Sequence, residues 1–461
     1  MRYYERTAGA WVEVVTLRPA DIVSGDGFGS WLAASNDFTE VAIGASSDET
    51  AGVMRAGTVR FFSRAGATWS YSGMLASPAP AVSNYFGASS ALSADGERLL
   101  VGEWGADTSA GTDAGRVHTY VRAGTSWVHA GTLSPTTVGA GHFFGAGVAV
   151  SADASIGVVG APGGAMAAGE GRAVAFERMD ASWTESAVLQ VVDGAAEGDV
   201  MGTAVDLSGP GDRALVTTPG NHREARVYVR SGTSWSLESL LETTASGVDT
   251  LGRAAAMARD GSRLVLGDQE AAPEFGRDQG VAIVFVRVGT GWVEEEILRS
   301  SSRSGPFGGA LAMSGDGSRL IVGHEHRTAT TASVGAAEVF VRVGTSWSRE
   351  TLLPGPSYQR FGEAVAISDD GTRALVGASD VPSWGGFTPG AAYVFRRASS
   401  TWTHEATLRA SFTDAFFPVR QRRRPFGRRF TSDRGCRLCR HRRGRQHRRR
   451  PRLRSHRHHL G

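Results

Sequence analysis

The sequence contains no lysine, and its only two cysteines, Cys436 and Cys439, lie near the C-terminus. Residues 1–417 therefore hold no disulfide, no thiolate nucleophile and no cysteine metal site. No apolar run reaches the roughly 18 residues that a membrane-spanning helix needs. The opening residues, MRYYERTAGAWVEV, lack the basic and apolar segments of a signal peptide. Helical periodicity and the short motifs of phosphate, dinucleotide and zinc-protease sites are also missing.

Charge is divided unevenly along the chain. Residues 418–461 contain 18 Arg and one acidic residue, whereas residues 1–417 contain 31 Arg and 45 acidic residues. The formal net charge of +3 therefore averages an acidic body and a strongly basic tail. The body also has ample apolar material for a core, with 41% hydrophobic residues overall and 61 Gly among 461 residues. This composition argues against global disorder.

A repeat of ~55 residues organises residues 1–417. Each copy has a Phe-Gly or related pair, then an apolar strand, a second apolar strand, and a tryptophan after a Gly-Thr-Ser type of turn. The pairs begin at Phe28, Phe86, Phe144, Met201, Leu251, Phe307 and Phe361, and the tryptophans are Trp69, Trp127, Trp183, Trp235, Trp292, Trp347 and Trp402. Trp11 precedes the first pair and belongs to an incomplete copy.

Each copy predicts four short antiparallel strands. The segment 361–377, FGEAVAISDDGTRALVG, shows two strands joined by an Asp-Gly hairpin, and the strand AAYVFRR follows before the tryptophan turn. Repeated four-stranded units close radially and bury edges that would otherwise aggregate, as in a β-propeller. We expect an all-β propeller of seven complete blades over residues 19–417, with 1–18 as the last two strands of a preceding blade. An eight-bladed or open ring that includes residues 1–18 is the alternative.

The repeat resembles the FG-GAP family, which includes bacterial FG-GAP proteins and the propeller of integrin α subunits. The resemblance rests on Phe361-Gly362 with Val376-Gly377-Ala378, and on Phe144-Gly145 with Val159-Gly160-Ala161-Pro162. Kelch and WD40 repeats fit the pattern less well. The resemblance implies a secreted or cell-surface binding module with a protein or glycan partner. The repeat boundaries place the start inside a repeat, so we expect the true N-terminus to lie upstream.

Most residues of chemical interest have a structural interpretation. The recurrent Phe and Trp are expected to pack between blades, and Gly beside Phe permits close backbone approach. Some FG-GAP members bind Ca²⁺ through several carboxylates in one turn, but the turns here offer single acidic residues or one adjacent pair, so we expect hairpins and no metal. These turns contain Asp95, Asp260, Asp316 and the pair Asp369-Asp370. The pair His324 and His326 is expected to lie in a solvated loop.

The basic tail, residues 418–461, is interpreted as a frameshifted next repeat that is disordered. A one-base shift in a GC-rich gene turns codons for Gly, Ala, Val and Asp into Arg codons. Advancing 419–436 by one base permits FGSAVALSGDGSRLIVGA, which matches 307–324 without a gap. Nucleic-acid binding by its arginines and zinc binding by Cys436 and Cys439 are the alternatives that this interpretation replaces.

Three functions remain open from the sequence. The first is a non-catalytic binding propeller that uses variable loops on one face. These loops span 103–115, 161–171, 268–280, 324–335 and 378–390. The second is a polysaccharide-processing enzyme, which would need carboxylates or histidines converging in the channel. The third is a structural domain of a larger surface protein. We favour the first and expect no catalytic residue, no cofactor and no nucleic-acid partner.

Overall fold

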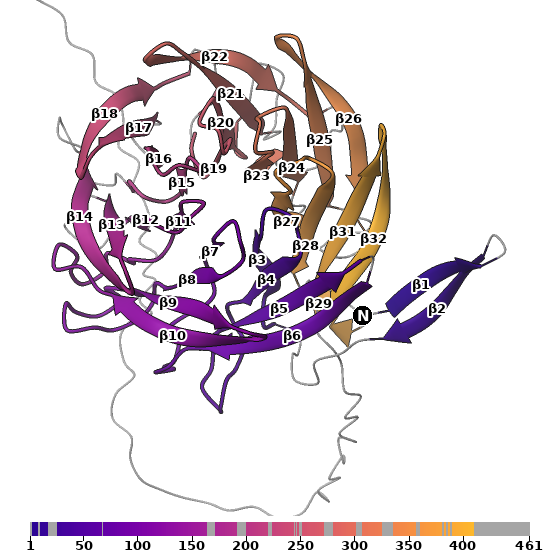
Figure 1. Cartoon of the computed structure of the whole chain (residues 1–461), viewed down its shortest axis with the longest axis horizontal. Coiled ribbons are helices and arrows are strands. Elements are labelled where there is room, and N and C mark those ends of the chain that lie inside the picture. The colour runs from indigo at the N-terminus through magenta and orange to yellow at the C-terminus, as the bar shows by residue number, and fades with distance from the viewer. Residues whose placement is uncertain are drawn as a thin grey trace, which may run out of the picture. The chain divides into compact units, whose positions relative to one another are not determined.

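Seven four-stranded antiparallel sheets and two two-stranded ones lie in the part of the chain that the computed structural model describes. The seven four-stranded sheets surround a central axis as the blades of a β-propeller (Figure 1). The chain divides into a unit Met1–Thr413 and a unit Asp414–Gly461. The described residues are 2–7, 10–16, 25–66, 68–163, 171–190, 200–219, 224–243, 245, 247–248, 251–271, 280–300, 307–324, 335–355, 360–379, 382–383, 386–387 and 390–409. Within them every regular element is a strand, which confirms the expected all-β class.

Blades 1 to 3 follow one another along the chain, and each uses four consecutive strands. Each second strand is buried over most of its length because it is covered on both faces by neighbouring blades. Their strands are β3 (Phe28–Ala34), β4 (Glu40–Ala45), β5 (Thr58–Ala65) and β6 (Thr68–Ala76); β7 (Ser90–Leu92), β8 (Arg98–Glu103), β9 (Arg116–Ala123) and β10 (Ser126–Leu133); β11 (Val148–Val150), β12 (Ile156–Ala161), β13 (Arg172–Met179) and β14 (Ser182–Gln190).

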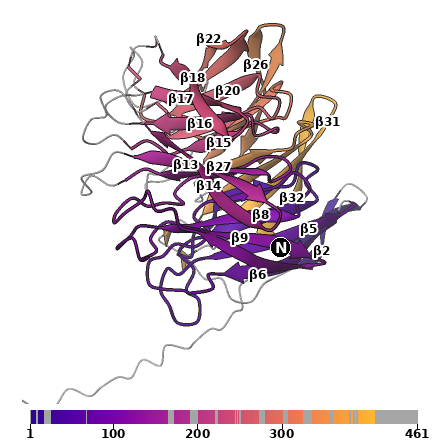
Figure 2. The same cartoon turned by 60° about the vertical axis from the view of Figure 1, so that its left-hand side comes forward.

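Blades 4 to 7 continue the same order, and their fourth strands lie at the rim in Figure 1; Figure 2 shows the same blades turned by 60°. Among the described residues, blade 7 alone has a further small sheet, formed by β29 (Pro382–Ser383) and β30 (Gly386–Phe387). The strands are β15 (Val205–Leu207), β16 (Arg213–Thr218), β17 (Glu224–Ser231) and β18 (Ser234–Leu241); β19 (Ala254–Met257), β20 (Arg263–Asp268), β21 (Val281–Val288) and β22 (Gly291–Leu298); β23 (Phe307–Met313), β24 (Arg319–His324), β25 (Ala336–Val343) and β26 (Ser346–Pro354); β27 (Arg360–Ile367), β28 (Arg373–Ser379), β31 (Ala391–Ala398) and β32 (Thr401–Arg409).

The antiparallel order defines two faces of the propeller. First strands begin, and second strands end, at the face that we call the loop face, where blades are also linked to one another. Both hairpin turns of every blade lie at the opposite face, which we call the turn face. In all seven blades the third and fourth strands pair with a register shift at the same repeat position, for example between Phe61 and Phe62. Such a bulge increases strand twist and lets the outer strand wrap the rim.

The Phe-Gly pairs form the contact between blades. Phe28, Phe86, Phe144, Phe307 and Phe361 are at most 1% exposed. The glycine after each Phe has a φ between 81° and 98°, a region in which a side chain would strain the backbone. A Cβ added to Gly323 in blade 6 would lie 2.0 Å from the Gly362 oxygen in blade 7. Glycine takes this second-strand position in six blades, and blade 4 has Thr217 there.

The ring closes by packing between blade 7 and blade 1. One buried cluster joins Phe28 and Leu32 of blade 1 with Leu375 and Leu408 of blade 7. The glycine contact is repeated there, because a Cβ on Gly377 would lie 2.2 Å from the Gly29 oxygen. Closure thus uses the same contact as five of the other six blade pairs.

The N-terminal residues do not add a blade. β1 (Arg2–Thr7) and β2 (Ala10–Thr16) pair with each other as a two-stranded sheet of their own. The alternative of an eight-bladed or open ring is therefore wrong, because blade 7 packs directly against blade 1. The tail 418–461 lies outside the described residues. No helix among the described residues is long and apolar enough to cross a membrane.

Candidate functional site

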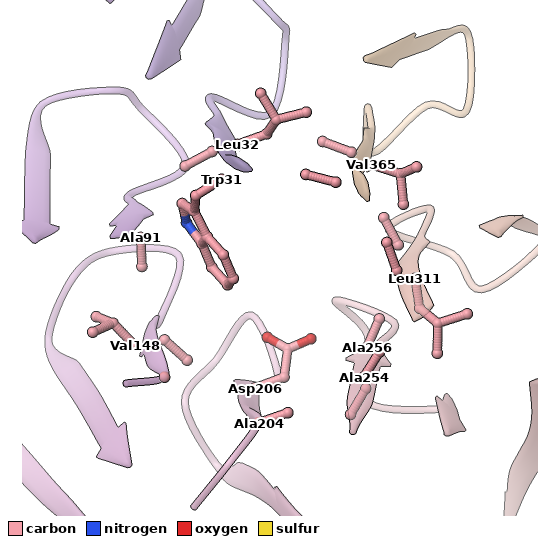
Figure 3. A pocket seen from close by; sticks show the side chains of 18 of the residues that line it. Trp31, Leu32, Ala91, Val148, Ala204, Asp206, Ala254, Ala256, Leu311 and Val365 are labelled. Carbon is pink, nitrogen blue, oxygen red and sulfur yellow. The ribbon is translucent and has the colours of Figure 1, made fainter. Parts of the chain in front are cut away.

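The first strands of all seven blades surround a central cavity of about 440 Å³ (Figure 3). Alanine, glycine and aliphatic residues make up most of its wall, and polar atoms are exposed among them. The lining residues come from 30–34, 90–92, 146–150, 203–206, 253–257, 309–313 and 363–367. A volume of this size is within the range of small-molecule sites.

Two residues in the cavity depart from the repeat. At the fourth position counted from Phe, six blades have Ser, Gly or Ala and blade 1 has Trp31. At the sixth position, six blades have Ala and blade 4 has Asp206. Both side chains point into the cavity (Figure 3). Because the other blades pack with small residues at these positions, neither side chain is needed to build a blade.

Asp206 is held by backbone donors. Its Oδ1 accepts from the Leu207 amide at 2.8 Å, and its Oδ2 accepts from the Met257 amide of blade 5 at 2.7 Å. Burial raises the pKa of the Asp206 carboxyl to about 6, and the two amides only partly oppose that rise. Among the described residues no charged side chain contributes to this pKa. The channel therefore contains a carboxylate that is mostly ionised at neutral pH and has no counter-ion from the described chain.

Trp31 is fixed at the cavity wall by its indole nitrogen. Trp31 Nε1 donates to the Ser90 carbonyl of blade 2 at 2.8 Å. At the loop-face mouth, Arg253 lies 3.5 Å from Glu270, and Glu363 accepts from Ser379. The charged groups at the mouth thus have partners of their own.

The turn-face end of the channel is narrowed by a chain of backbone hydrogen bonds between successive hairpin turns. A smaller cavity of about 110 Å³ lies at this end. The bonds run from blade 1 to blade 7: Asn36 N to Ala94 O, Ala94 N to Ala152 O, Ala152 N to Gly209 O, Gly209 N to Arg259 O, Asp260 N to Gly315 O, and Gly315 N to Asp369 O. A broader depression of about 670 Å³ lies over the same turns.

The aspartates of the Asp-Gly turns accept hydrogen bonds from residues of their own turns. Asp316 Oδ1 accepts from Ser314 Oγ at 2.7 Å and from the Ser318 amide at 2.9 Å. Asp95, Asp260 and Asp370 likewise accept from the amide two residues on. Burial alone would raise the pKa of Asp316, but these hydrogen bonds lower it. The hydrogen bonds of the hairpin turn therefore explain why an aspartate stands at this position.

His324 does not lie in a solvated loop, as the sequence had led us to expect. It ends β24, is 1% exposed, and packs edge-on against Phe307 with ring centroids 4.9 Å apart. Its Nε2 lies 3.0 Å from Glu338 Oε1, because Glu338 on β25 is buried beside it. The expectation of a solvated loop was wrong, because His324 ends a strand and is buried together with the carboxylate of Glu338. His326 lies outside the described residues.

The seven repeat tryptophans occupy equivalent positions on the fourth strands. Trp69, Trp292 and Trp347 are buried, whereas Trp127, Trp183, Trp235 and Trp402 are half-buried. Trp292, Trp347 and Trp402 each donate Nε1 to a glutamate of the preceding blade, at 3.1, 3.0 and 2.9 Å. An arginine five residues before each Trp approaches the same glutamate. The sequence signal was an Arg-x4-Trp-x2-Glu pattern, which sequence analysis missed.

The loop face of blades 1 and 2 carries two loops of the same construction. Thr50 and Val53 exchange backbone hydrogen bonds in one loop, and Thr108 and Gly111 do so in the other. Sequence analysis named 103–115 as a variable loop, and the structure describes it in full. Much of the other four named loops lies outside the described residues.

Backbone bonds tie these loops to the links between blades. Ser83 N donates to Met54 O at 3.1 Å, Gly105 N to Asn84 O at 3.2 Å, and Phe143 N to Asp113 O at 3.1 Å. The loop face over blades 1 to 3 is therefore hydrogen-bonded across blade boundaries.

An aromatic cluster sits on this face. Tyr85 stacks on Trp104 with centroids 4.5 Å apart, and Phe143 meets Trp104 edge-on at 5.5 Å. All three are half-buried, and Tyr85 and Phe143 have φ near 55°, which bulky residues rarely adopt. Beside them Met54 and Val82 are 60% and 67% exposed. Sequence analysis missed this cluster because its members come from separate parts of two repeats.

Solved structures share the fold. A putative 6-phosphogluconolactonase from Bacteroides uniformis matches with a TM-score of 0.53 and 12% identity, covering 81% of this chain and 98% of that chain. A chain of the mitotic checkpoint complex matches at 0.50 and 13%, covering 85% and 93%. Sqt1 from Saccharomyces cerevisiae matches at 0.50 and 9%, covering 86% and 89%. Neither a family model nor a curated protein matches the sequence. At these identities the likeness shows a propeller fold alone.

Proposed function

We propose that the chain is a non-catalytic binding propeller of the FG-GAP type, acting outside the cell or at its surface. The recognition surface is the loop face of blades 1 to 3. The observation that carries the proposal is the Tyr85–Trp104–Phe143 cluster beside the exposed Met54 and Val82. Exposed apolar groups that lie together mark interaction sites. The hydrogen bonds within this surface hold its loops in place, so less conformational entropy is lost on binding.

A protein partner fits this surface better than a glycan. Sugars stack on an open aromatic face, but Tyr85 covers one face of the Trp104 indole and Phe143 approaches it as well. Met54 and Val82 add aliphatic surface, which suits the apolar centre of a protein interface. The mixed charge of the exposed Arg55 and Asp107 and the half-buried Asp113 supplies a polar rim.

Protein and glycan arrays test the proposal with the full chain. The double variant Met54→Asp/Val82→Asp should bind its protein partner at least tenfold more weakly than the unaltered chain. Val343→Asp is the matched control, because Val343 is 68% exposed at the turn face, and it should bind normally. The arginine-rich tail is identical in all three proteins, so any binding by the tail contributes equally to the three measurements. Equal binding by all three proteins, or binding to glycans alone, would refute the proposal.

An enzyme is the second candidate, favoured by the Asp206 carboxylate in the channel and by a fold shared with a protein named as a lactonase. Lactone and polysaccharide hydrolysis assays with the full chain discriminate the two functions. Turnover that is lost in Asp206→Asn, with loop-face variants unaffected, would replace the binding proposal by an enzymatic one.

A further inference from the structure

We propose that the central channel binds an alkylammonium group between Asp206 and Trp31. The site lies apart from the loop surface of the proposed function and does not depend on it. Its two defining residues are the departures from the repeat inside the cavity, one a carboxylate and the other an indole. Six blades close the ring with small residues at the same two positions, so blade packing does not explain either side chain.

The charge of Asp206 favours a cation. A carboxylate carries about four lone-pair sites, and the Leu207 and Met257 amides use two of them. Neutral amides offset only part of the desolvation cost of an ion in an apolar cavity. Among the described residues no arginine or histidine forms an ion pair with Asp206. An ammonium group supplies both the missing charge and further donors.

Trp31 provides the second contact. Its indole nitrogen is already bonded to the Ser90 carbonyl, so the ring is held in place and its π-face remains the available contact. Indole is the aromatic group that attracts cations most strongly. Figure 3 shows the indole and the Asp206 carboxylate projecting into the same cavity from different blades. The aliphatic wall between them suits the alkyl part of the ligand.

Size and access limit the ligand. The cavity of about 440 Å³ accepts a small amine or the side chain of a lysine residue. Hydrogen-bonded turns surround the turn-face end of this cavity. Free amines and lysyl groups share the same chemistry, and the two sources are separated by testing both.

Calorimetry on the full chain tests the site with butylammonium and with Nα-acetyl-lysine methylamide. Butanol and butyrate are the neutral and anionic controls. We expect at least one of the two ammonium probes to bind at least tenfold more tightly than either control. A preference for butylammonium points to a free amine, and a preference for the lysine derivative points to a lysyl group. No preference for either ammonium probe over butanol would overturn the proposal.

Variants assign the binding to this site. Asp206→Asn keeps an acceptor for the Met257 amide but removes the charge, and it should weaken binding at least tenfold. Trp31→Phe retains a ring with a weaker quadrupole and should weaken binding about threefold. Asp180→Asn, at an exposed turn outside the channel, is the matched control and should bind normally. Circular dichroism verifies folding, and if Asp206→Asn does not fold, Trp31→Phe decides the test. Unchanged binding in the folded variants would overturn the site.

Discussion

The indole nitrogen of Trp347 donates a hydrogen bond of 3.0 Å to Glu295 Oε2, and the two residues belong to neighbouring blades. The same carboxylate lies 2.6 Å from Arg342 and 3.4 Å from Arg263. The arrangement recurs at Glu238 and Glu350, so three successive blade junctions have one design. The repeat tryptophan thus has a polar contact between blades in addition to its packing.

Removing Glu295 should destabilise the propeller. Glu295→Ala leaves two arginines and the Trp347 indole without their acceptor, and we expect the free energy of unfolding to fall by about 3 kcal/mol. Urea denaturation measures the change. Glu185→Ala is the control, because Glu185 is exposed on a fourth strand, and its effect should stay within about 0.5 kcal/mol. Equal losses from both variants would contradict a specific role for Glu295.

The same three glutamates should make the propeller acid-labile. Burial opposes ionisation, yet hydrogen bonds from arginine and tryptophan hold the pKa values of Glu238, Glu295 and Glu350 below their usual value. Groups with a lowered folded pKa stabilise the protein above the unfolded pKa of about 4.3, and that stability is lost as pH falls through the folded pKa. Thermal midpoints from pH 7 to pH 3 should therefore fall less steeply in a Glu→Gln triple variant.

How far the sequence could predict the molecule depends on whether a feature repeats. The Phe-Gly pairs and Asp-Gly turns recur, so the seven blades followed from spacing, as Phe361 and Asp370 illustrate. The polar contacts between blades were missed because they join residues ~50 positions apart, as in Trp347 and Glu295. The channel residue Asp206 was missed because it occurs in one blade only, and a comparison of repeats looks for the residues that recur.

Contact between blades 6 and 7 should depend on the glycine of the second strand in blade 6. A Cβ at Gly323 would meet the Gly362 carbonyl oxygen at 2.0 Å, and backbone in a packed ring cannot move aside cheaply. Gly323→Ala should therefore cost at least about 3 kcal/mol or prevent folding. Gly291→Ala is the control, because its nearest neighbour would lie 3.9 Å away, and it should be neutral. Chemical denaturation compares the two, and a tolerated Gly323→Ala would show that the junction is looser than the contact implies.

The tryptophans should differ in importance according to burial. Trp69 is fully buried, so Trp69→Ala should lower the free energy of unfolding by about 3–5 kcal/mol. Trp127 is half-buried at the equivalent position, and its replacement by Ala should cost less. Denaturant midpoints of the two variants show which replacement lowers stability more. A larger loss in Trp127→Ala than in Trp69→Ala would contradict the prediction.

Asp206 should cost stability at neutral pH. Its folded pKa of about 6 lies above the unfolded value of about 3.9, so the folded state prefers the protonated acid. Stability is then greatest below the unfolded pKa and declines as pH rises through the folded pKa, by up to about 3 kcal/mol. Asp206→Asn, which is neutral at every pH, should therefore melt higher than the unaltered chain at pH 7.5 and at about the same temperature at pH 4. Calorimetric melting at the two pH values measures this difference. A variant that is less stable at both values would assign the carboxylate to holding blades 4 and 5 together through Met257. A variant stabilised only at neutral pH would mean that the channel retains a charge the fold does not need, as a binding residue would require.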